Sequence, residues 1–209
     1  MAQKGELPGK KVANQWRFHL SSIDEYLQDK IIKTPEYDLS AIIKTSTVFP
    51  LSRLIHKSDI MLDLRSGGQS GVLRELSECA EKAGLTNSKE KLYIKLFERE
   101  QMLTTAIGNG VAIPHPRNPS EDLIKKPGII IGRSNKGVDF GSPDKKKIHL
   151  FVMPCASDVI LHLKLLSKIA HLFKVENINN LFLNAKTKDE VIKILLGVEN
   201  IQINTGNKY

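Results

Sequence analysis

The sequence predicts an α/β protein in which helices cover a central sheet. The sequence pattern indicates this fold class, because residues 58–199 alternate between short apolar runs and longer stretches whose apolar residues recur three and four positions apart. A polar segment with proline breakers precedes this region and sets it apart from residues 1–28. The expected strands are residues 60–64, 111–113, 128–132 and 148–153, and the expected helices are residues 70–83, 88–102, 157–174 and 187–196.

Residues 1–28 have a character of their own. A turn signal at residues 7–9 is followed by two short runs, KKVAN and QWRFH, which predict a small hairpin, and residues 21–27 predict a short helix. The segment resembles the latter half of an excisionase- or MerR-type winged helix-turn-helix domain. The half that reads bases in that family would lie upstream of Met1, so we expect no DNA binding by residues 1–28 as they stand. Residues 29–57 are expected to be a linker, and residues 200–209 a C-terminal tail.

The composition is typical of a soluble cytoplasmic protein. The net charge of +8 is spread along the 209 residues, so charge alone does not predict nucleic-acid binding. We find no apolar run long enough to cross a bilayer and no leader, and expect no membrane insertion. Cys79 and Cys155 lie far apart and match no metal-binding spacing, which predicts two buried thiols in a reducing compartment.

Residues 108–119, GNGVAIPHPRNP, carry the strongest functional signal. A glycine turn leads into a short apolar run that ends on His115, between Pro114 and Pro116. Pro114 fixes its own φ, and Pro116 favours an extended backbone at His115. With an ordinary pKa of about 6.5, the imidazole is mostly neutral and one ring nitrogen can attack an electrophile. The alternative is a structural histidine in a proline-rich loop.

Four pieces of sequence are similar to a known family and occur in that family's order: DIMLDL, VLRELSECAEKAG, FEREQMLTTAIGNGVAIPH and HLKLLSKIAHLF. From about residue 58 to residue 197 the chain resembles the enzyme IIA domain of the bacterial phosphotransferase system, of the fructose–mannitol and nitrogen-regulatory type. The resemblance implies a mixed central sheet flanked by helices. It also implies a phosphotransferase component in which His115 becomes phosphorylated. Pro116 departs from the family pattern, which usually has a small residue there.

Two further residues are candidates for the same site. His162 lies about one turn into an expected helix, on its apolar face, where a hydrogen-bonded core histidine is the alternative. Arg99 lies in the segment FERE, where a solvated arginine is the alternative. The resemblance implies that His162, as an imidazolium, and Arg99 stabilise a phosphoryl group. Backbone and hydroxyl donors for that group are expected from Thr104, Thr105, Gly108 and Gly110.

We expect no metal and no other cofactor. A zinc site on His115 and His162 is a weak alternative, because a third and a fourth ligand are missing from the sequence pattern. His19, His56, His149 and His171 are assigned to no site.

The resemblance implies that phosphorylated HPr is the donor, and that the phosphoryl group then passes to a IIB domain or signals to a regulatory protein. The partial winged-helix segment favours a nitrogen-regulatory role. The first alternative is a sugar-uptake IIA component for a fructose- or mannitol-type permease. The second is a DNA-binding regulator with a phosphorylation-sensing IIA domain.

Overall fold

The computed structural model describes residues 10–12, 15–17 and 50–206, which fall into two compact units, Met1–Phe49 and Pro50–Tyr209. In the first unit, β1 (Lys10–Val12) pairs antiparallel with β2 (Gln15–Arg17). This pairing confirms the expected hairpin. The expected helix at residues 21–27 and most of the expected linker lie outside the described residues.

The second unit is built on a mixed sheet of five strands, in the order β3-β6-β7-β5-β4. The central strand β7 runs antiparallel to β6 and parallel to β5, while β3 is parallel to β6 and β4 is antiparallel to β5. A mixed sheet is therefore confirmed. The strands are β3 (Ile60–Met61), β4 (Ala106–Gly108), β5 (Val111–Ala112), β6 (Gly128–Val138) and β7 (Ile148–Cys155).

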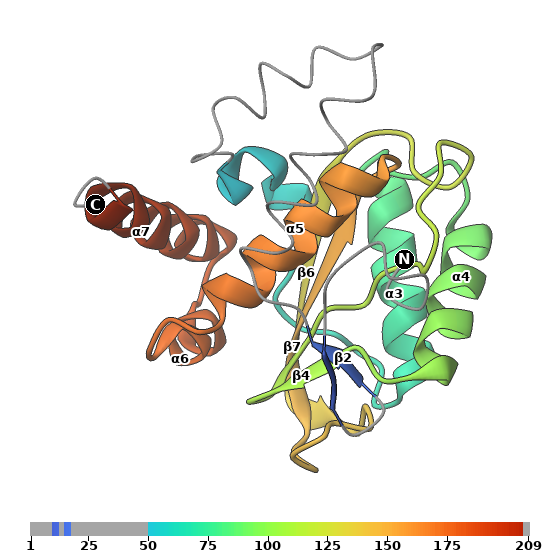
Figure 1. Ribbon diagram of the computed structural model, residues 1–209, viewed down its shortest axis with the longest axis horizontal. Coiled ribbons are helices and arrows are strands. Elements are labelled where there is room, and N and C mark those ends of the chain that lie inside the picture. Colours follow the sequence, from blue (N-terminus) through green and yellow to red (C-terminus); the bar gives the residue numbers. More distant parts are fainter. Residues whose placement is uncertain (1–9, 13–14, 18–49, 207–209) are drawn as a thin grey trace. The chain divides into compact units, whose positions relative to one another are not determined.

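Helices lie on both sides of this sheet (Figure 1). Those on one side are α3 (Gln69–Lys82) and α4 (Lys89–Met102), and those on the other are α5 (Val159–Leu172), α6 (Ile178–Asn184) and α7 (Lys188–Gly206). The side chains of Ser88 and Asp158 accept hydrogen bonds from backbone N–H groups in the first turns of α4 and α5, as N-cap residues do. All four expected helices are present.

The structure differs from the sequence expectation in several elements, among them β6, which continues past residue 132 to Val138. Strand β4 and the seven-residue helix α6 were not predicted, because neither is long enough to show a period. Helix α7 continues past residue 196 and includes residues 200–206 of the expected tail.

The expected linker also ends earlier than residue 57. Residues 51–59 form two short 3-10 helices of the second unit, with Leu51 and Ile55 buried. The Ser52 hydroxyl donates to the Glu199 carboxylate at 2.6 Å, which ties this segment to α7.

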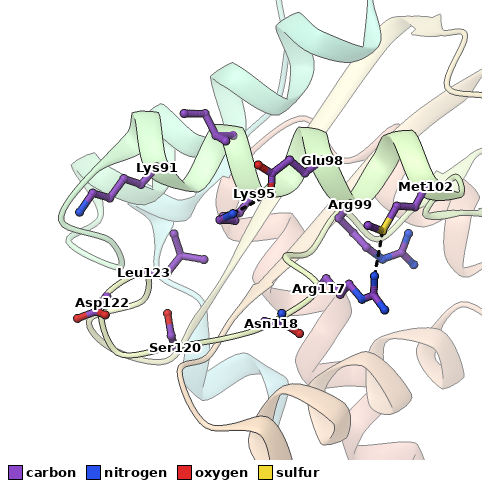
Figure 2. Close-up of a pocket in the computed structure, with 11 residues that line it drawn as sticks. Lys91, Lys95, Glu98, Arg99, Met102, Arg117, Asn118, Ser120, Asp122 and Leu123 are labelled. Carbon is purple, nitrogen blue, oxygen red and sulfur yellow. Dashed lines mark hydrogen bonds and ion pairs between the residues drawn. The ribbon is translucent and has the colours of Figure 1, made fainter. Parts of the chain in front are cut away.

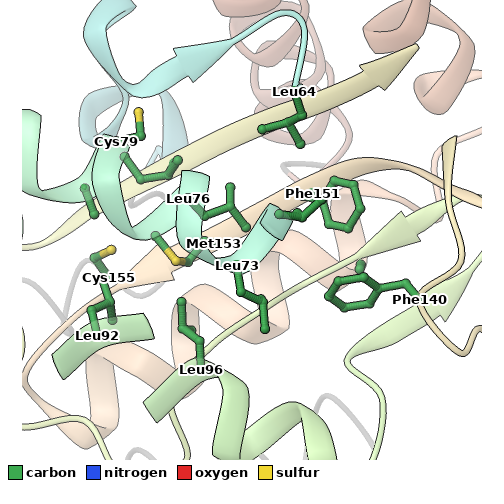
Figure 3. Close-up of a cluster of buried hydrophobic side chains, with 14 of the residues drawn as sticks. Leu64, Leu73, Leu76, Cys79, Leu92, Leu96, Phe140, Phe151, Met153 and Cys155 are labelled. Atoms are coloured by element: carbon green, nitrogen blue, oxygen red, sulfur yellow. The ribbon is translucent and has the colours of Figure 1, made fainter. Parts of the chain in front are cut away.

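A large cluster of buried hydrophobic side chains lies between the sheet and the α3–α4 pair (Figure 3). Leu73 and Leu76 of α3 meet Leu92 and Leu96 of α4 and the side chains of alternate β7 residues, such as Phe151 and Met153. The sheet is covered on both faces, so β7 is buried along most of its length. Cys79 and Cys155 are buried free thiols, as predicted, and burial raises their pKa values to about 11 and about 12.

Within the described part of the chain, none of the helices has both the length and the apolar character that a membrane span requires.

Candidate functional site

The strand directions bring three separate segments to one edge of the sheet. Strands β5 and β7 are parallel, with Val111 opposite Leu150, so the chain leaves both strands at the same edge. After β5 it continues to His115, and after β7 it enters α5, which carries His162. Because β4 is antiparallel to β5, its start lies at that edge too, directly after the end of α4 with Arg99.

The His115 imidazole is held in one orientation by a main-chain carbonyl group two residues earlier in the chain. Its Nδ1 lies 2.7 Å from the carbonyl oxygen of Ile113, which can only accept a hydrogen bond. Nδ1 therefore carries the ring proton, and Nε2 keeps its lone pair. Desolvation by burial lowers the pKa of His115 to about 3; the hydrogen bond to Ile113 opposes this shift, while the charge of Arg99 and the neighbouring His162 add to it. The ring is neutral at physiological pH.

His162 faces His115 from the first turn of α5. The two ring centroids are 5.5 Å apart and the rings are tilted by 56°. His162 is only 4% exposed, and desolvation lowers its pKa to about 4. Its Nδ1 is buried without a hydrogen-bond partner among the described residues. Burial thus favours the neutral His162 ring in the unphosphorylated protein, and an imidazolium beside a phosphoryl group stays a prediction.

Arg99 reaches the site from the last turn of α4. Its Nη1 donates to the carbonyl oxygen of Leu103 at 2.7 Å, which caps the end of the helix. Its charge also contributes to the lowered pKa of His115. Sequence analysis and structure therefore agree that His115, His162 and Arg99 are neighbours.

The four expected auxiliary donors are not available to a ligand on His115. The Thr104 hydroxyl donates to the carbonyl oxygen of Phe140 at 2.7 Å, and the Thr105 hydroxyl donates to the buried Glu100 carboxylate at 2.5 Å. The two glycines flank Asn109 in the β4–β5 turn, at the opposite end of β5 from His115. There the Asn109 N–H donates to Asp144, a carboxylate that would repel a phosphate. These four expectations are corrected for Thr104, Thr105, Gly108 and Gly110.

A groove of about 680 Å³ lies beside the site, between α4 and residues 117–123 (Figure 2). Arg99 lies at one end of it, next to Arg117, which sequence analysis did not single out. The position of Arg117 two residues after His115 was the signal that could have drawn attention to it.

Three other histidines with described positions take no part in the site: His56, His149 and His171. His149 Nδ1 lies 3.0 Å from the carbonyl oxygen of Ser134, and His171 is exposed near the end of α5. Over the residues that the structure describes, no group of three or more His, Cys, Asp or Glu side chains could hold a metal ion.

The buried histidines predict that acid destabilises the fold. An unfolded histidine titrates near pH 6.5, whereas the pKa of folded His162 is about 4, so between these values the unfolded chain binds a proton that the folded chain does not. The contribution of the neutral His162 ring to the stability of the fold is complete above about pH 6.5 and is lost as the pH falls to about 4. By about pH 5, His162 alone should lower the free energy of unfolding by about 2 kcal/mol. Urea unfolding of wild type and His162→Gln between about pH 7.5 and pH 5 should give a smaller pH dependence in the variant. Equal pH dependence in the two proteins would contradict the neutral, buried ring.

A neutral histidine with one fixed lone pair, beside a second buried histidine and an arginine, is chemically suited to accept a phosphoryl group. The sequence comparisons agree with this chemistry. The family described as "Phosphoenolpyruvate-dependent sugar phosphotransferase system, EIIA 2" matches residues 53–197. The chain belongs to this EIIA family, and is a phosphoryl-transfer component of the phosphotransferase system.

The relatives include both sugar-specific and regulatory proteins. The chain is 33% identical over 147 residues to the fructose-specific EIIABC component of Bacillus subtilis, covering 69% of this chain but only 23% of that protein. It is 32% identical to the mannitol-specific enzyme IIA component of Geobacillus stearothermophilus, covering 68% of this chain and 94% of that protein. The crystal structure of nitrogen regulatory protein IIA-Ntr from Neisseria meningitidis is similar with a TM-score of 0.63 and 27% identity, over 69% of this chain and 98% of that one.

Proposed function

We propose that this protein is a phosphocarrier that accepts a phosphoryl group on Nε2 of His115. The observation that supports this most directly is the hydrogen bond from Nδ1 of His115 to the carbonyl oxygen of Ile113. It leaves only Nε2 with a lone pair, and desolvation keeps the ring neutral, so this lone pair is free at physiological pH.

The donor is a phosphohistidine carrier protein of the HPr kind. The P–N bond of the donor breaks and its electron pair returns to the donor nitrogen, while the lone pair of His115 Nε2 forms the new P–N bond. The Nδ1 proton stays on His115, where the Ile113 carbonyl oxygen stabilises the positive charge of the phosphorylated ring. Arg99 and His162 lie where charge on the phosphoryl oxygens needs donors.

Three downstream roles fit such a carrier in the cytoplasm. In the first, phosphorylation of His115 changes a contact with a regulatory protein, as in the nitrogen-regulatory role. In the second, the phosphoryl group passes to a IIB domain of a fructose- or mannitol-type permease. Incubating the phosphorylated protein with a fructose-type or a mannitol-type IIB domain distinguishes the first role from the second, because only the second role predicts rapid transfer of the label to IIB. In the third role, as a DNA-binding regulator, phosphorylation would change duplex binding.

The carrier step is tested with ³²P-labelled phospho-HPr. We expect wild type to take up acid-labile phosphate, and ³¹P NMR of the product to show phosphorylation at a histidine Nε2. Label on Nδ1 of His115 would contradict the assignment of the attacking nitrogen. No uptake at all would contradict the proposed function.

A further inference from the structure

Two arginine side chains from different segments lie next to each other at one end of the groove. Arg99 comes from α4 and Arg117 from the loop after His115, and Figure 2 shows both guanidinium groups beside Met102. Desolvation lowers the pKa of Arg99; the charge of Glu100 opposes this shift and the charge of Arg117 adds to it. The two guanidinium groups are therefore close enough to repel each other.

Neither arginine forms an ion pair with a carboxylate among the described residues. Arg99 donates to the Leu103 carbonyl oxygen, and Arg117 Nη1 lies 3.5 Å from the thioether sulfur of Met102, a weak acceptor. The Glu100 carboxylate accepts two hydrogen bonds from Thr105, and no ion pair joins it to either arginine among the described residues. Two adjacent guanidinium groups with only weak or neutral partners repel each other. An anion that binds between them removes this repulsion and accepts hydrogen bonds from both.

The backbone connects this pair to His115. Pro116 is buried, fixes its own φ and favours an extended conformation at His115. Arg117 follows two residues after His115, where the chain bends, and its side chain is exposed. The buried proline that replaces the family's usual small residue thus stiffens the short chain segment between the imidazole and the second guanidinium.

We propose that Arg117 is a second phosphoryl-binding guanidinium, which leaves Met102 and, together with Arg99, donates to the oxygens of the phosphoryl group on His115. The inference rests on the proposed function, since it assigns a further residue to the same transfer. Arg117 is suited to this movement because it is exposed and, with respect to the described residues, it forms a weak hydrogen bond to the sulfur of Met102.

The role predicts a change in equilibrium as well as in rate. A residue that only helps the donor protein to dock changes the forward and reverse rates alike, and leaves the equilibrium between free proteins where it was. A residue that binds the phosphoryl group after the donor has left stabilises the phosphorylated protein itself. The equilibrium constant for transfer from phospho-HPr therefore separates the two roles.

The experiment compares wild type with Arg117→Ala, Arg117→Lys and Lys91→Ala. Each protein is mixed with phospho-HPr, and the phosphorylated fractions of both proteins are measured at equilibrium. We expect Arg117→Ala to lower the equilibrium constant roughly 10-fold, because it loses charge-assisted hydrogen bonds. The equilibrium constant of Arg117→Lys should lie between those of wild type and Arg117→Ala, since an ammonium group keeps the charge but lacks the planar arrangement of N–H donors. Lys91 is an exposed cation at the other end of the groove, so Lys91→Ala should match wild type.

A second measurement does not depend on the donor. In ³¹P NMR, the titration of the phosphoryl group on His115 should move to higher pH in Arg117→Ala, because the dianion loses a cation. If phosphorylation is normal but both the equilibrium constant and this titration match wild type, the inference about Arg117 is overturned and the proposed function stands. If wild type takes up no phosphate, the proposed function fails, and this inference fails with it.

Discussion

Substitution of His115 by alanine abolishes phosphate uptake from phospho-HPr, although every other residue of the site is still present. The reason is that the other imidazole of the site, that of His162, is not accessible to a donor protein. His162 is neutral but only 4% exposed, so a donor protein cannot bring its phosphoryl group in line with that ring. The measurement is incorporation of ³²P after a long incubation, with label in the variant expected to stay at background.

The matched control is His171→Ala, which removes an exposed histidine near the end of α5 and should label like wild type. Circular dichroism and urea unfolding of both variants check that the fold is retained. Label in a folded His115→Ala protein would mean that the nucleophile is another residue.

Sequence reasoning could predict that His115, His162 and Arg99 belong to one site, but the geometry that unites them depends on long-range strand pairing. The pairing of β5 with β7 joins residues that are 39 positions apart, Val111 and Leu150, and leaves no local pattern. Its parallel direction places His115 beside the start of α5. The helices were easier to predict, because their apolar faces and their caps at Ser88 and Asp158 are local signals.

The auxiliary donors were mispredicted for the same physical reason. Thr104 and Thr105 are close to Arg99 in sequence, and a hydroxyl group is a plausible phosphate ligand wherever it is free. Whether it is free depends on tertiary partners, which here are the carbonyl oxygen of Phe140 and the carboxylate of Glu100. The turn formed by the two glycines around Asn109 was expected to lie beside His115, because the turn and the histidine are close in sequence. A short strand separates the two, and places the turn at the opposite end of β5, beside Asp144.

The tautomer of His115 was also outside the reach of sequence analysis. The acceptor for its Nδ1–H is a main-chain carbonyl oxygen, that of Ile113, and every residue has one. Only coordinates show which carbonyl group is within hydrogen-bond distance of the ring.

Substitution of His162 by alanine should slow phosphoryl transfer to His115 by about 100-fold, while His115 still becomes labelled given enough time. Nδ1 of His162 is buried and has no hydrogen-bond partner in the part of the chain that the structure describes, an arrangement that is costly unless a ligand completes it. A phosphoryl group on His115 supplies negative charge beside the ring, so it raises the pKa of His162 from about 4 and favours a proton there. His162 therefore donates most strongly when the phosphoryl group is present, as transition-state stabilisation requires.

His162→Gln is the informative companion variant, because an amide keeps one N–H donor but cannot gain a charge. We expect its transfer rate to lie between those of wild type and His162→Ala. In wild type, ¹⁵N NMR of the imidazoles should show that His162 gains a proton on phosphorylation near pH 7. Rates equal to wild type in both variants would remove His162 from the transfer step. A full loss of labelling in a folded His162→Ala protein would instead make it part of the acceptor, which the fixed lone pair on Nε2 of His115 argues against.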